Sequence, residues 1–542
     1  MQTNIFGSTE EHGITLAQAA EKACVSVATV RNWIKTGYLS QTGKGLVSRK
    51  SFDDFMLNIA GKEKLNSRAN KLSKNEHRHT KTSLKVSTLL QDYSGEDPGT
   101  IYENSLADAD RNREGIYYTP TWVIKDMFRN IEISKDFTFL DPCCGSGNFL
   151  VEAIRAGVSP ENVYGYDTDK NAVQITKARL KKEFDIETSN ICVGDFLEKA
   201  FELKSSDTFF DLVFTNPPWG KKIDRINKKW FADLYNCGNS LDTTALFMGA
   251  SLSVLKQEGI LGFLVQEAFF NISTFEFIRR KVANKKILRL VDYGKVFKGL
   301  ITKAQAIIIE NTASSTTTQI ECTISDNNFT RDLVSFRKNP KNIFNFWTTQ
   351  EESRVIDRLY AVNHITLQER ARWALGIVTG NNKKYCLDKQ EAGYIPIYKG
   401  SDITKTGLKN PSTFIVSDFT NFQQVAPLEI YQAKEKLIYK FISSDLCFYH
   451  DTEQRYILNS ANLLIPFNTG ITGEQLAALL NSQIMNWLFK KIFSTHKILR
   501  SDLELLPIHT AYFSERSIFS EYDYLDYLQV TKTKYGTFSI KG

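Results

Sequence analysis

The sequence predicts an α/β fold in which a doubly wound, Rossmann-like sheet is combined with an N-terminal helix-turn-helix and a C-terminal α+β domain. Between residues 137 and 266, short apolar runs alternate with amphipathic helical stretches, as in a parallel sheet whose faces are covered by helices. Residues 14–39 carry two short helical patterns. The pattern becomes mixed beyond about residue 325, where one long helix is predicted across residues 473–493. A chain of 542 residues is also too long for one hydrophobic core and favours about three domains.

The composition is that of an ordinary globular protein, with 42% hydrophobic and 24% charged residues. No apolar run approaches the roughly 20 residues of a membrane span, and the polar N-terminus lacks the order of a signal peptide, so we expect a cytoplasmic protein with no membrane partner. The eight cysteines form no Cys-x-x-Cys pair, so the sequence predicts neither a metal site nor a disulfide framework. A net charge of +7 is compatible with a polyanionic partner.

Residues 1–60 are predicted to form a helix-turn-helix domain. Ser26 is the expected N-cap of its second helix and Gly37 the expected C-terminal stop. The stretch resembles the helix-turn-helix of excisionases and similar small regulators, in which the second helix enters the major groove. The donors expected on the outer face of that helix are Thr29, Arg31, Asn32 and Lys35. The alternative is a helical module that packs on the rest of the chain or on a partner.

Residues 61–95 are predicted to be a basic linker. Residues 60–90 hold eight lysines and arginines against two acidic residues, Glu63 and Glu76, with few apolar residues between them. Such a segment can follow phosphates without folding, although a solvated spacer would have the same composition.

A glycine loop follows the first apolar run of the predicted sheet, with the sequence Asp-Pro-Cys-Cys-Gly-Ser-Gly-Asn-Phe from Asp141. Gly145 and Gly147 permit positive φ and a close approach of the backbone to a ligand, and the helix that follows favours an anionic group. The third glycine of the dinucleotide-binding pattern is absent. Cys143 follows a proline, as the nucleophile of cytosine-C5 methyltransferases does, but its place inside the loop predicts a small loop residue instead.

Two further strand ends carry acidic residues. Asp167 lies about 20 residues after the glycine loop, at the position where a carboxylate is expected to accept the hydroxyls of a ribose. Asp195 and Phe196 follow the next apolar run, where a carboxylate could take an amino group and an aromatic ring could cover a purine. The three strand ends together could hold a methionine, a ribose and an adenine in turn.

The tetrapeptide Asn216-Pro217-Pro218-Trp219 follows the strand predicted at 210–214. The Asn216 side-chain oxygen and the Pro217 carbonyl can accept hydrogen bonds from the exocyclic amine of adenine, which frees its lone pair to attack a sulfonium methyl group. The two prolines fix φ, so these acceptors are held in place, and Trp219 offers a flat face to an extruded base. A plain turn after a strand is the alternative, and it explains neither the position nor the elements upstream.

From these motifs the chain resembles the gamma class of N6-adenine DNA methyltransferases of restriction–modification systems. The resemblance covers residues 98–510 and places a Rossmann-like methyltransferase domain at 96–325 and a target-recognition domain at 326–542. The phrases at 373–385, 394–403, 458–466 and 476–508 resemble the specificity domain of that class. Val296 and Phe297, with the strand predicted at 304–309, match the motif whose phenylalanine stacks on the flipped base opposite Trp219.

The resemblance also assigns the residues that would bind S-adenosyl-L-methionine. Asp141 would face its methionine amino group, Asp167 its ribose and Asp195 its adenine amine. The remaining members of the expected set are Thr119, Gly145, Gly147 and Phe196, with Thr119-Pro120 matching the additional donor-binding motif.

The resemblance therefore predicts an enzyme that methylates adenine N6 in double-stranded DNA after base flipping, with a separate restriction endonuclease of the same system as a further partner. A methyltransferase acting on protein glutamine or on RNA guanine shares the tetrapeptide and stays an alternative. A bifunctional enzyme would need a nuclease motif, which residues 1–100 do not offer. A helix-turn-helix regulator with an inactive fold is disfavoured by the intact Asn216, Asp167 and Asp195.

Overall fold

The computed structural model describes residues 13–23, 27–35, 39–43, 45–58, 117–220, 223–297, 300, 302–315, 317–494 and 497–542. The chain divides into two compact units, residues 1–106 and 107–542. Among the residues within these ranges, no helix is long and apolar enough to cross a bilayer. The predicted linker at 61–95 and the segment at 98–116 lie outside the described residues.

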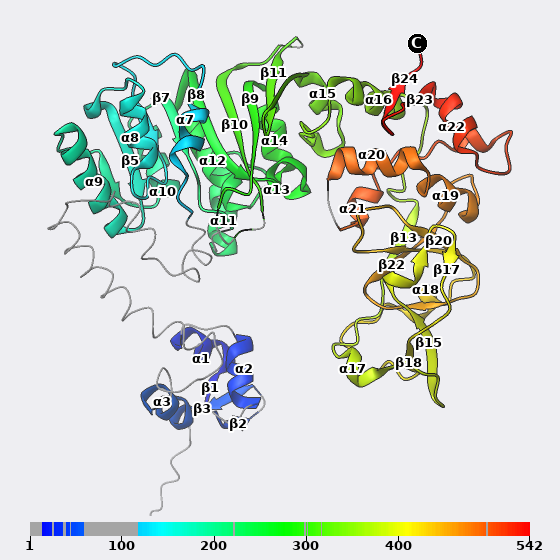
Figure 1. Ribbon diagram of the computed structural model, residues 1–542. Coiled ribbons are helices and arrows are strands. Elements are labelled where there is room, and N and C mark those ends of the chain that lie inside the picture. The colour runs from blue at the N-terminus through cyan, green and yellow to red at the C-terminus, as the bar shows by residue number, and fades with distance from the viewer. Residues whose placement is uncertain are drawn as a thin grey trace, which may run out of the picture. The chain divides into compact units, whose positions relative to one another are not determined.

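The first unit is a small α+β module (Figure 1). Its sheet has the order β1-β3-β2, and Trp33 packs on Phe55 in its core, with ring centroids 4.7 Å apart. Ser26, Gly37 and the side chains of Thr29, Asn32 and Lys35 lie outside the description, whereas Arg31 is exposed as expected. The helix-turn-helix therefore stays a prediction. The elements are β1 (Gly13–Thr15), α1 (Leu16–Lys22), α2 (Val27–Lys35), β2 (Gln41–Gly43), β3 (Leu46–Ser48) and α3 (Arg49–Asn58).

The second unit is built around a sheet with the strand order β12-β11-β9-β10-β8-β7-β4-β5-β6. Pairings among β4, β5, β6, β7 and β8 are parallel, which confirms the doubly wound sheet in that part. Strand order reverses between β4 and β7, and ligands of such sheets bind at the carboxyl ends beside that reversal. The strands are β4 (Phe139–Asp141), β5 (Val163–Asp167), β6 (Ile191–Val193), β7 (Phe210–Thr215), β8 (Leu255–Gln266), β9 (Lys285–Gly294), β10 (Ala304–Ala313), β11 (Gln319–Ile324) and β12 (Asn327–Asp332).

The rest of this sheet, formed by strands for which the sequence predicted no orientation, is mixed. Strand β10 runs antiparallel to both β8 and β9, and β12 runs antiparallel to β11. The connection at 295–303 between β9 and β10 is shorter than the dozen or more residues that a parallel crossover needs. A short connection therefore returns the chain antiparallel to β9. The predicted boundary between residues 325 and 326 falls between the paired strands β11 and β12.

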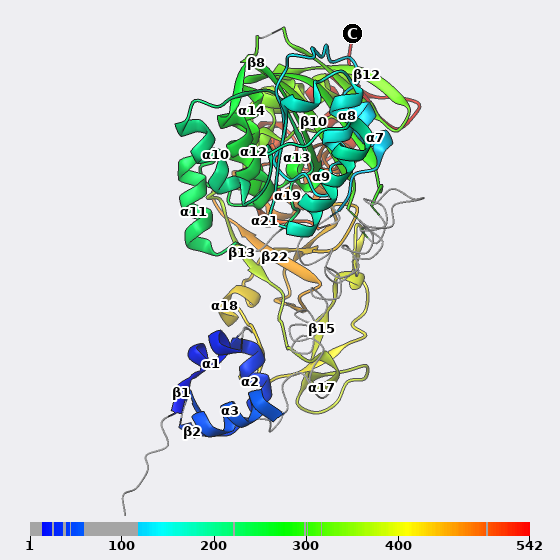
Figure 2. The same ribbon diagram turned by 90° about the vertical axis from the view of Figure 1, so that its left-hand side faces the viewer.

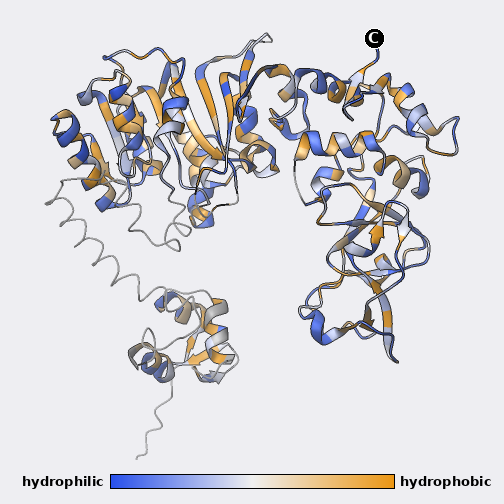
Figure 3. Cartoon of the chain, in the orientation of Figure 1, coloured by the Kyte–Doolittle hydropathy of each residue, from blue (hydrophilic) through white to orange (hydrophobic). Residues whose placement is uncertain are grey.

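Helices cover both faces of the sheet, and apolar residues gather on its strands (Figures 2 and 3). One core contains residues of α10 (Phe196–Ser205), α11 (Arg225–Leu234), α12 (Thr243–Ser253) and α14 (Glu276–Ala283). The other contains residues of α7 (Thr121–Met127), α8 (Asn148–Arg155) and α9 (Lys170–Phe184). The strands are apolar on both faces because both faces are buried.

The C-terminal part contains two four-stranded sheets, with the orders β13-β22-β19-β20 and β14-β18-β15-β21. The long helix predicted across 473–493 is wrong: the structure has α19 (Gly473–Leu480) and α20 (Gln483–Phe493). The helix breaks because Asn481 caps α19 and the Ser482 hydroxyl accepts the Met485 amide to start α20. The strands are β13 (Ala371–Leu375), β14 (Cys386–Leu387), β15 (Tyr394–Tyr398), β18 (Phe414–Val416), β19 (Lys436–Lys440), β20 (Phe448–Asp451), β21 (Tyr456–Ile457) and β22 (Ala461–Pro466).

The end of α20 joins the sheet region to the C-terminal part. The last carbonyls of a helix have no partner inside it and need donors from elsewhere. Asn271 donates to the Phe493 carbonyl at 3.0 Å, and Asn345 and Trp347 both donate to the Lys491 carbonyl at 3.1 Å. These contacts cap α20 with side chains from upstream in the chain.

Candidate active site

The glycine loop lies at the carboxyl end of β4 and has the backbone that the sequence predicts. Gly145 and Gly147 have φ of 50° and 88°, in the left-handed region. A Cβ atom on Gly147 would lie 2.9 Å from Thr176 Cγ2, so only glycine fits there. Helix α9 holds the loop from outside, because the Thr176 hydroxyl donates to the Gly145 carbonyl at 2.8 Å and the Arg179 guanidinium to the Ser146 carbonyl at 2.6 Å. The loop is therefore rigid before any ligand binds.

Asp141, at the end of β4, is fully buried and only half satisfied. Its Oδ1 accepts the Thr215 hydroxyl at 2.7 Å and the Cys143 amide at 3.0 Å, while its Oδ2 is buried without a hydrogen-bond partner. Burial raises the pKa of Asp141 to about 7, the two hydrogen bonds oppose that shift, and the charge of Asp167 adds to it. A buried carboxylate oxygen without a donor is costly, so this atom is suited to a cationic ligand group.

Asp167 and Asp195 both lie where strands end, and both also organise the loops that follow. Asp167 is half-buried at the end of β5, and its carboxylate accepts the Gly145 amide at 2.9 Å and the Asp169 amide at 2.8 Å. Asp195 is the N-cap of α10 and accepts the Leu197 amide at 3.0 Å. The structure thus brings Asp167 into direct contact with the glycine loop.

Phe196 lies deeper than the sequence suggested. Only 1% of it is exposed, and its ring packs in the core with Tyr166 and Phe247, each at a centroid distance of 6.1 Å. In this arrangement the ring offers almost no free face to a purine. Its stacking role stays a prediction that would require the ring to turn outward.

Asn216 follows β7 and has an amide whose orientation is fixed by the main chain. Its Nδ2 donates to the Tyr117 carbonyl at 2.7 Å, and its Oδ1 is buried without a hydrogen-bond partner. Because a carbonyl can only accept, the NH2 end must face Tyr117, which leaves the oxygen free as an acceptor. The two unpaired acceptors, Asn216 Oδ1 and Asp141 Oδ2, lie at the carboxyl ends of the adjacent strands β7 and β4. The hydrogen bond from the Thr215 hydroxyl to the Asp141 carboxylate joins these two strand ends.

Three aromatic rings meet beside Asn216. Trp219 and Phe297 are 9% and 6% exposed, and their centroids are 5.2 Å apart with ring planes at 82°. Tyr117 contacts both, at 6.1 Å and 5.5 Å. A base stacked between two parallel rings would need them about 7 Å apart, twice a van der Waals contact of about 3.5 Å. Trp219 and Phe297 are therefore neighbours, but their rings contact each other and leave no space for a base between them.

The loop that carries Phe297 is anchored at its base by Asp292. This buried carboxylate accepts the Gly294 amide at 2.8 Å on one oxygen. Its other oxygen accepts Lys303 and Gln305, each at 3.0 Å. Both ends of the loop are thereby tied to one side chain, so a movement of Phe297 is confined to the loop.

Residues 117–120 cross from the glycine loop to the tetrapeptide. The buried Thr119 accepts the Asn148 amide on its carbonyl at 3.2 Å, two residues after the carbonyl that orients Asn216. A Cβ atom on Gly145 would lie 3.1 Å from Tyr118 Cε1, so the Tyr118 ring covers this turn. The predicted site residues include Thr119 but not Tyr117 or Tyr118, although two aromatic residues directly before Thr119-Pro120 were a sign that this segment contributes to the site.

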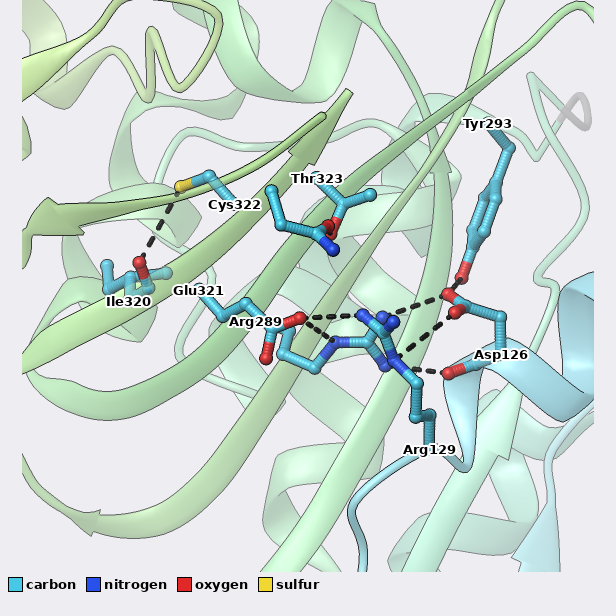
Figure 4. A network of polar contacts seen from close by, with 9 residues as sticks. Asp126, Arg129, Arg289, Tyr293, Ile320, Glu321, Cys322 and Thr323 are labelled. Carbon is cyan, nitrogen blue, oxygen red and sulfur yellow. Dashed lines mark hydrogen bonds and ion pairs between the residues drawn. The ribbon is translucent and has the colours of Figure 1, made fainter. Parts of the chain in front are cut away.

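Helix α7 holds this segment from behind through a charged network (Figure 4). The Asp126 carboxylate accepts the Arg289 guanidinium at 2.9 Å and the Tyr293 hydroxyl at 2.8 Å. Arg129 pairs with Glu321 at 2.6 Å. Burial, followed by the charge of Asp126, raises the pKa of the Tyr293 hydroxyl, which therefore stays protonated as a donor. The network ties α7 to β9 and β11 and so fixes the start of the segment.

Comparison with known proteins gives two family matches and a close relative. The N-6 DNA methylase family matches residues 94–360, and the TaqI-like C-terminal specificity domain matches residues 395–508. The type II methyltransferase M.VspI of Vibrio sp. (strain 343) is 43% identical over 412 residues, which are 75% of this chain and 100% of the relative. The modification methylase CviBIII of Paramecium bursaria Chlorella virus NC1A is 24% identical and covers 39% of this chain and 54% of its own.

Among solved structures, the type IIL restriction-modification enzyme MmeI in complex with DNA superposes with a TM-score of 0.50 at 12% identity. The match covers 75% of this chain and 70% of MmeI. At 12% identity the similarity concerns the fold alone. Because the match covers 75% of the chain, it includes more than the residues of the nine-stranded sheet.

Proposed function

The chain belongs to the family of restriction–modification DNA methyltransferases that pair an N-6 DNA methylase domain with a TaqI-like C-terminal specificity domain, and we propose that it methylates adenine N6 in double-stranded DNA with S-adenosyl-L-methionine as donor. The observation that carries this proposal is the buried, unpaired Asn216 Oδ1, whose direction is set by the Tyr117 carbonyl. An acceptor held in this way is suited to the amine of a base.

The residues around the glycine loop fit the proposed donor. The unpaired Asp141 Oδ2 would receive its ammonium group, and Asp167 and Asp195 would receive the ribose hydroxyls and the adenine amine. Gly145 and Gly147 leave room for a close approach of the ligand to the backbone. S-Adenosyl-L-methionine, when bound, supplies a methyl group on a positively charged sulfur that leaves with its electron pair.

The acceptor side of the proposed reaction depends on two hydrogen-bond acceptors. Asn216 Oδ1 and the Pro217 carbonyl would accept the two N–H groups of the amine and turn its lone pair away from the ring. The nitrogen would then form a bond to the methyl carbon as the carbon–sulfur bond breaks, and its extra proton would pass to bulk water. Because the acceptors are already placed, little reorganisation accompanies the reaction. Pro217 and Pro218 hold the turn by fixing φ at two successive residues.

The target adenine would have to leave the double helix, at a cost of a few kcal/mol. Trp219 and Phe297 would stack on its two faces, after parting from their present contact of 5.2 Å. We assign the reading of the DNA sequence to the C-terminal domain at 326–542 and catalysis to residues 96–325. A separate restriction endonuclease of the same system would be kept from cutting host DNA by this modification.

The experiment that tests the chemistry uses labelled S-adenosyl-L-methionine, duplex DNA and nucleoside mass spectrometry. We expect N6-methyladenine without added metal. Label on cytosine carbon, or only on protein or RNA, would overturn the proposal and favour one of the alternative methyltransferase classes.

The residue assignments are tested by two variants and a matched control. Asn216→Ala should lower kcat by about 10²-fold or more while donor binding persists, because the acceptor acts mainly in the transition state. Asp167→Ala should instead weaken donor binding. Asn328→Ala, on the exposed edge strand β12, removes an asparagine of the same size and should change neither. Equal losses of donor affinity in Asn216→Ala and Asp167→Ala would contradict the assignments.

A further inference from the structure

Helix α11 begins six residues after Trp219, directly beyond the catalytic tetrapeptide. Asp224 starts it, accepting the amides of Ile226 and Asn227 at 3.0 Å. Its inner side buries Phe231 against α12 and the sheet core. Six residues of extended chain span at most about 20 Å, so the first turn of α11 lies within that distance of Trp219.

The outer face of α11 carries two large apolar side chains. Ile226 is 82% exposed and Trp230 is 51% exposed. They are four residues apart and therefore lie on one face of the helix. Exposing apolar side chains to water is unfavourable, and contiguous exposed apolar surface is a candidate binding surface. This face is distinct from the side that packs on the core.

The same helix is rich in positive charge. Arg225 and Lys229 are exposed and Lys228 is half-exposed. Across the described residues of the chain, no carboxylate lies within 4 Å of any of these three cations. The only acidic residue within α11 is Asp233, and the Asp224 carboxylate is occupied by the helix start. Unpaired cations around an aromatic side chain complement a nucleic-acid backbone with its sugars and bases.

We propose that α11 is a DNA-contacting element that binds the strand beside the target base. Arg225, Lys228 and Lys229 contact phosphates, and Ile226 and Trp230 pack on sugar or base surface. With about 3.4 Å per nucleotide step, the reach of about 20 Å places the start of α11 within about six nucleotide steps of Trp219. The proposal rests on the DNA methyltransferase activity of the family and is independent of which base is methylated.

The first test compares salt-titrated duplex binding of Arg225→Ala/Lys229→Ala with that of wild type. Loss of two phosphate contacts should make the slope of log Kd against log salt shallower by up to about 1.8, and weaken binding about tenfold at low salt. The matched control is Lys182→Ala/Lys204→Ala, which removes two exposed lysines from the last turns of α9 and α10. Those turns lie at the opposite edge of the sheet, so the control should bind like wild type.

The second test places a photo-crosslinking amino acid at position 230 or, as control, at position 204. We expect a cross-link to duplex DNA only from position 230. Donor binding by calorimetry should be unchanged in every variant, which shows that each is folded. A slope equal to that of the control, or cross-links from position 230 to a second copy of the chain instead of DNA, would overturn the proposal. Methylation of an unexpected base would refute the proposed function and leave these binding results intact.

Discussion

Replacing Asp141 with asparagine should stabilise the ligand-free enzyme at alkaline pH and weaken donor binding. Burial raises the pKa of Asp141 from 3.8 in the unfolded chain to about 7. Between these two values the folded protein binds more protons than the unfolded one, so this group makes the folded state less stable as pH rises. The favourable contribution is fully present below pH 3.8 and is lost as pH rises through about 7.

The magnitude follows from the shift of about three units, each worth 1.36 kcal/mol, or about 4 kcal/mol well above pH 7. About 1.5 kcal/mol of this cost is already present at pH 5, so the difference between pH 5 and pH 8.5 is about 2.5 kcal/mol. The asparagine side chain would avoid the charge cost but leave an unpaired buried NH2 group, at roughly 1–3 kcal/mol. Asp141→Asn should therefore raise the free energy of unfolding by about 1–3 kcal/mol at pH 8.5.

The assay is differential scanning fluorimetry of ligand-free protein at both pH values, with calorimetry for donor binding. An unfolding entropy of about 2.1 cal/mol/K per residue over the unit at 107–542 corresponds to about 1 °C per kcal/mol. The Tm difference between Asp141→Asn and wild type should therefore grow by roughly 2–3 °C from pH 5 to pH 8.5. Donor affinity should fall about 10²-fold or more, because a buried ion pair is lost. Asp136→Asn, an exposed control, should change neither. Equal Tm differences at both pH values, or normal donor binding by Asp141→Asn, would refute the reasoning.

Two further predictions concern the base pocket and the division of labour along the chain. Phe297→Ala should leave DNA binding nearly intact but lower kcat/KM about 10- to 100-fold, as stacking on a base is worth about 1–3 kcal/mol. The fluorescence of 2-aminopurine at the target position should fall in parallel, and an unchanged signal would exclude Phe297 from the pocket. Deleting residues 1–85 should leave the methylated word unchanged while weakening affinity with a shallower salt dependence, whereas replacing loops within 375–510 should change or abolish the word. Methylome sequencing of both proteins decides this, and a new word from the truncation would make the N-terminal unit a specificity element.

The sequence predicted the strands and the residues at their ends because each has a local signature. Apolar runs followed by Asp141, Asp167 or Asn216 are visible within a few residues. The contact that orients Asn216 was not predictable, since its partner is a main-chain carbonyl 99 residues earlier. A carbonyl has no side-chain identity, so no residue type marks it.

Other differences also arise from tertiary context. The motif suggested a ligand-facing Phe196, but an aromatic residue at the start of a helix is equally compatible with the core, where it is buried. The break between α19 and α20 depends on Ser482, the N-cap of α20. One serine inside a continuous apolar helical pattern does not reveal such a break in the sequence. Antiparallel β10 follows from the length of one connection and not from the composition of the strand.

The contacts that cap the end of α20 affect how such enzymes would acquire new DNA recognition sequences by recombination. The acceptors at this junction are the Lys491 and Phe493 carbonyls, which any residue would provide, and the donors Asn271, Asn345 and Trp347 lie upstream. An incoming C-terminal module therefore needs a helix that ends at the same place and a basic residue at position 491, because the Lys491 ammonium pairs with the Glu352 carboxylate at 2.7 Å. A crossover after Glu352 would keep all three donors on the upstream side and exchange most of the C-terminal domain that we propose to read the DNA sequence. On the proposed division of labour, this junction would allow one specificity domain to be exchanged for another.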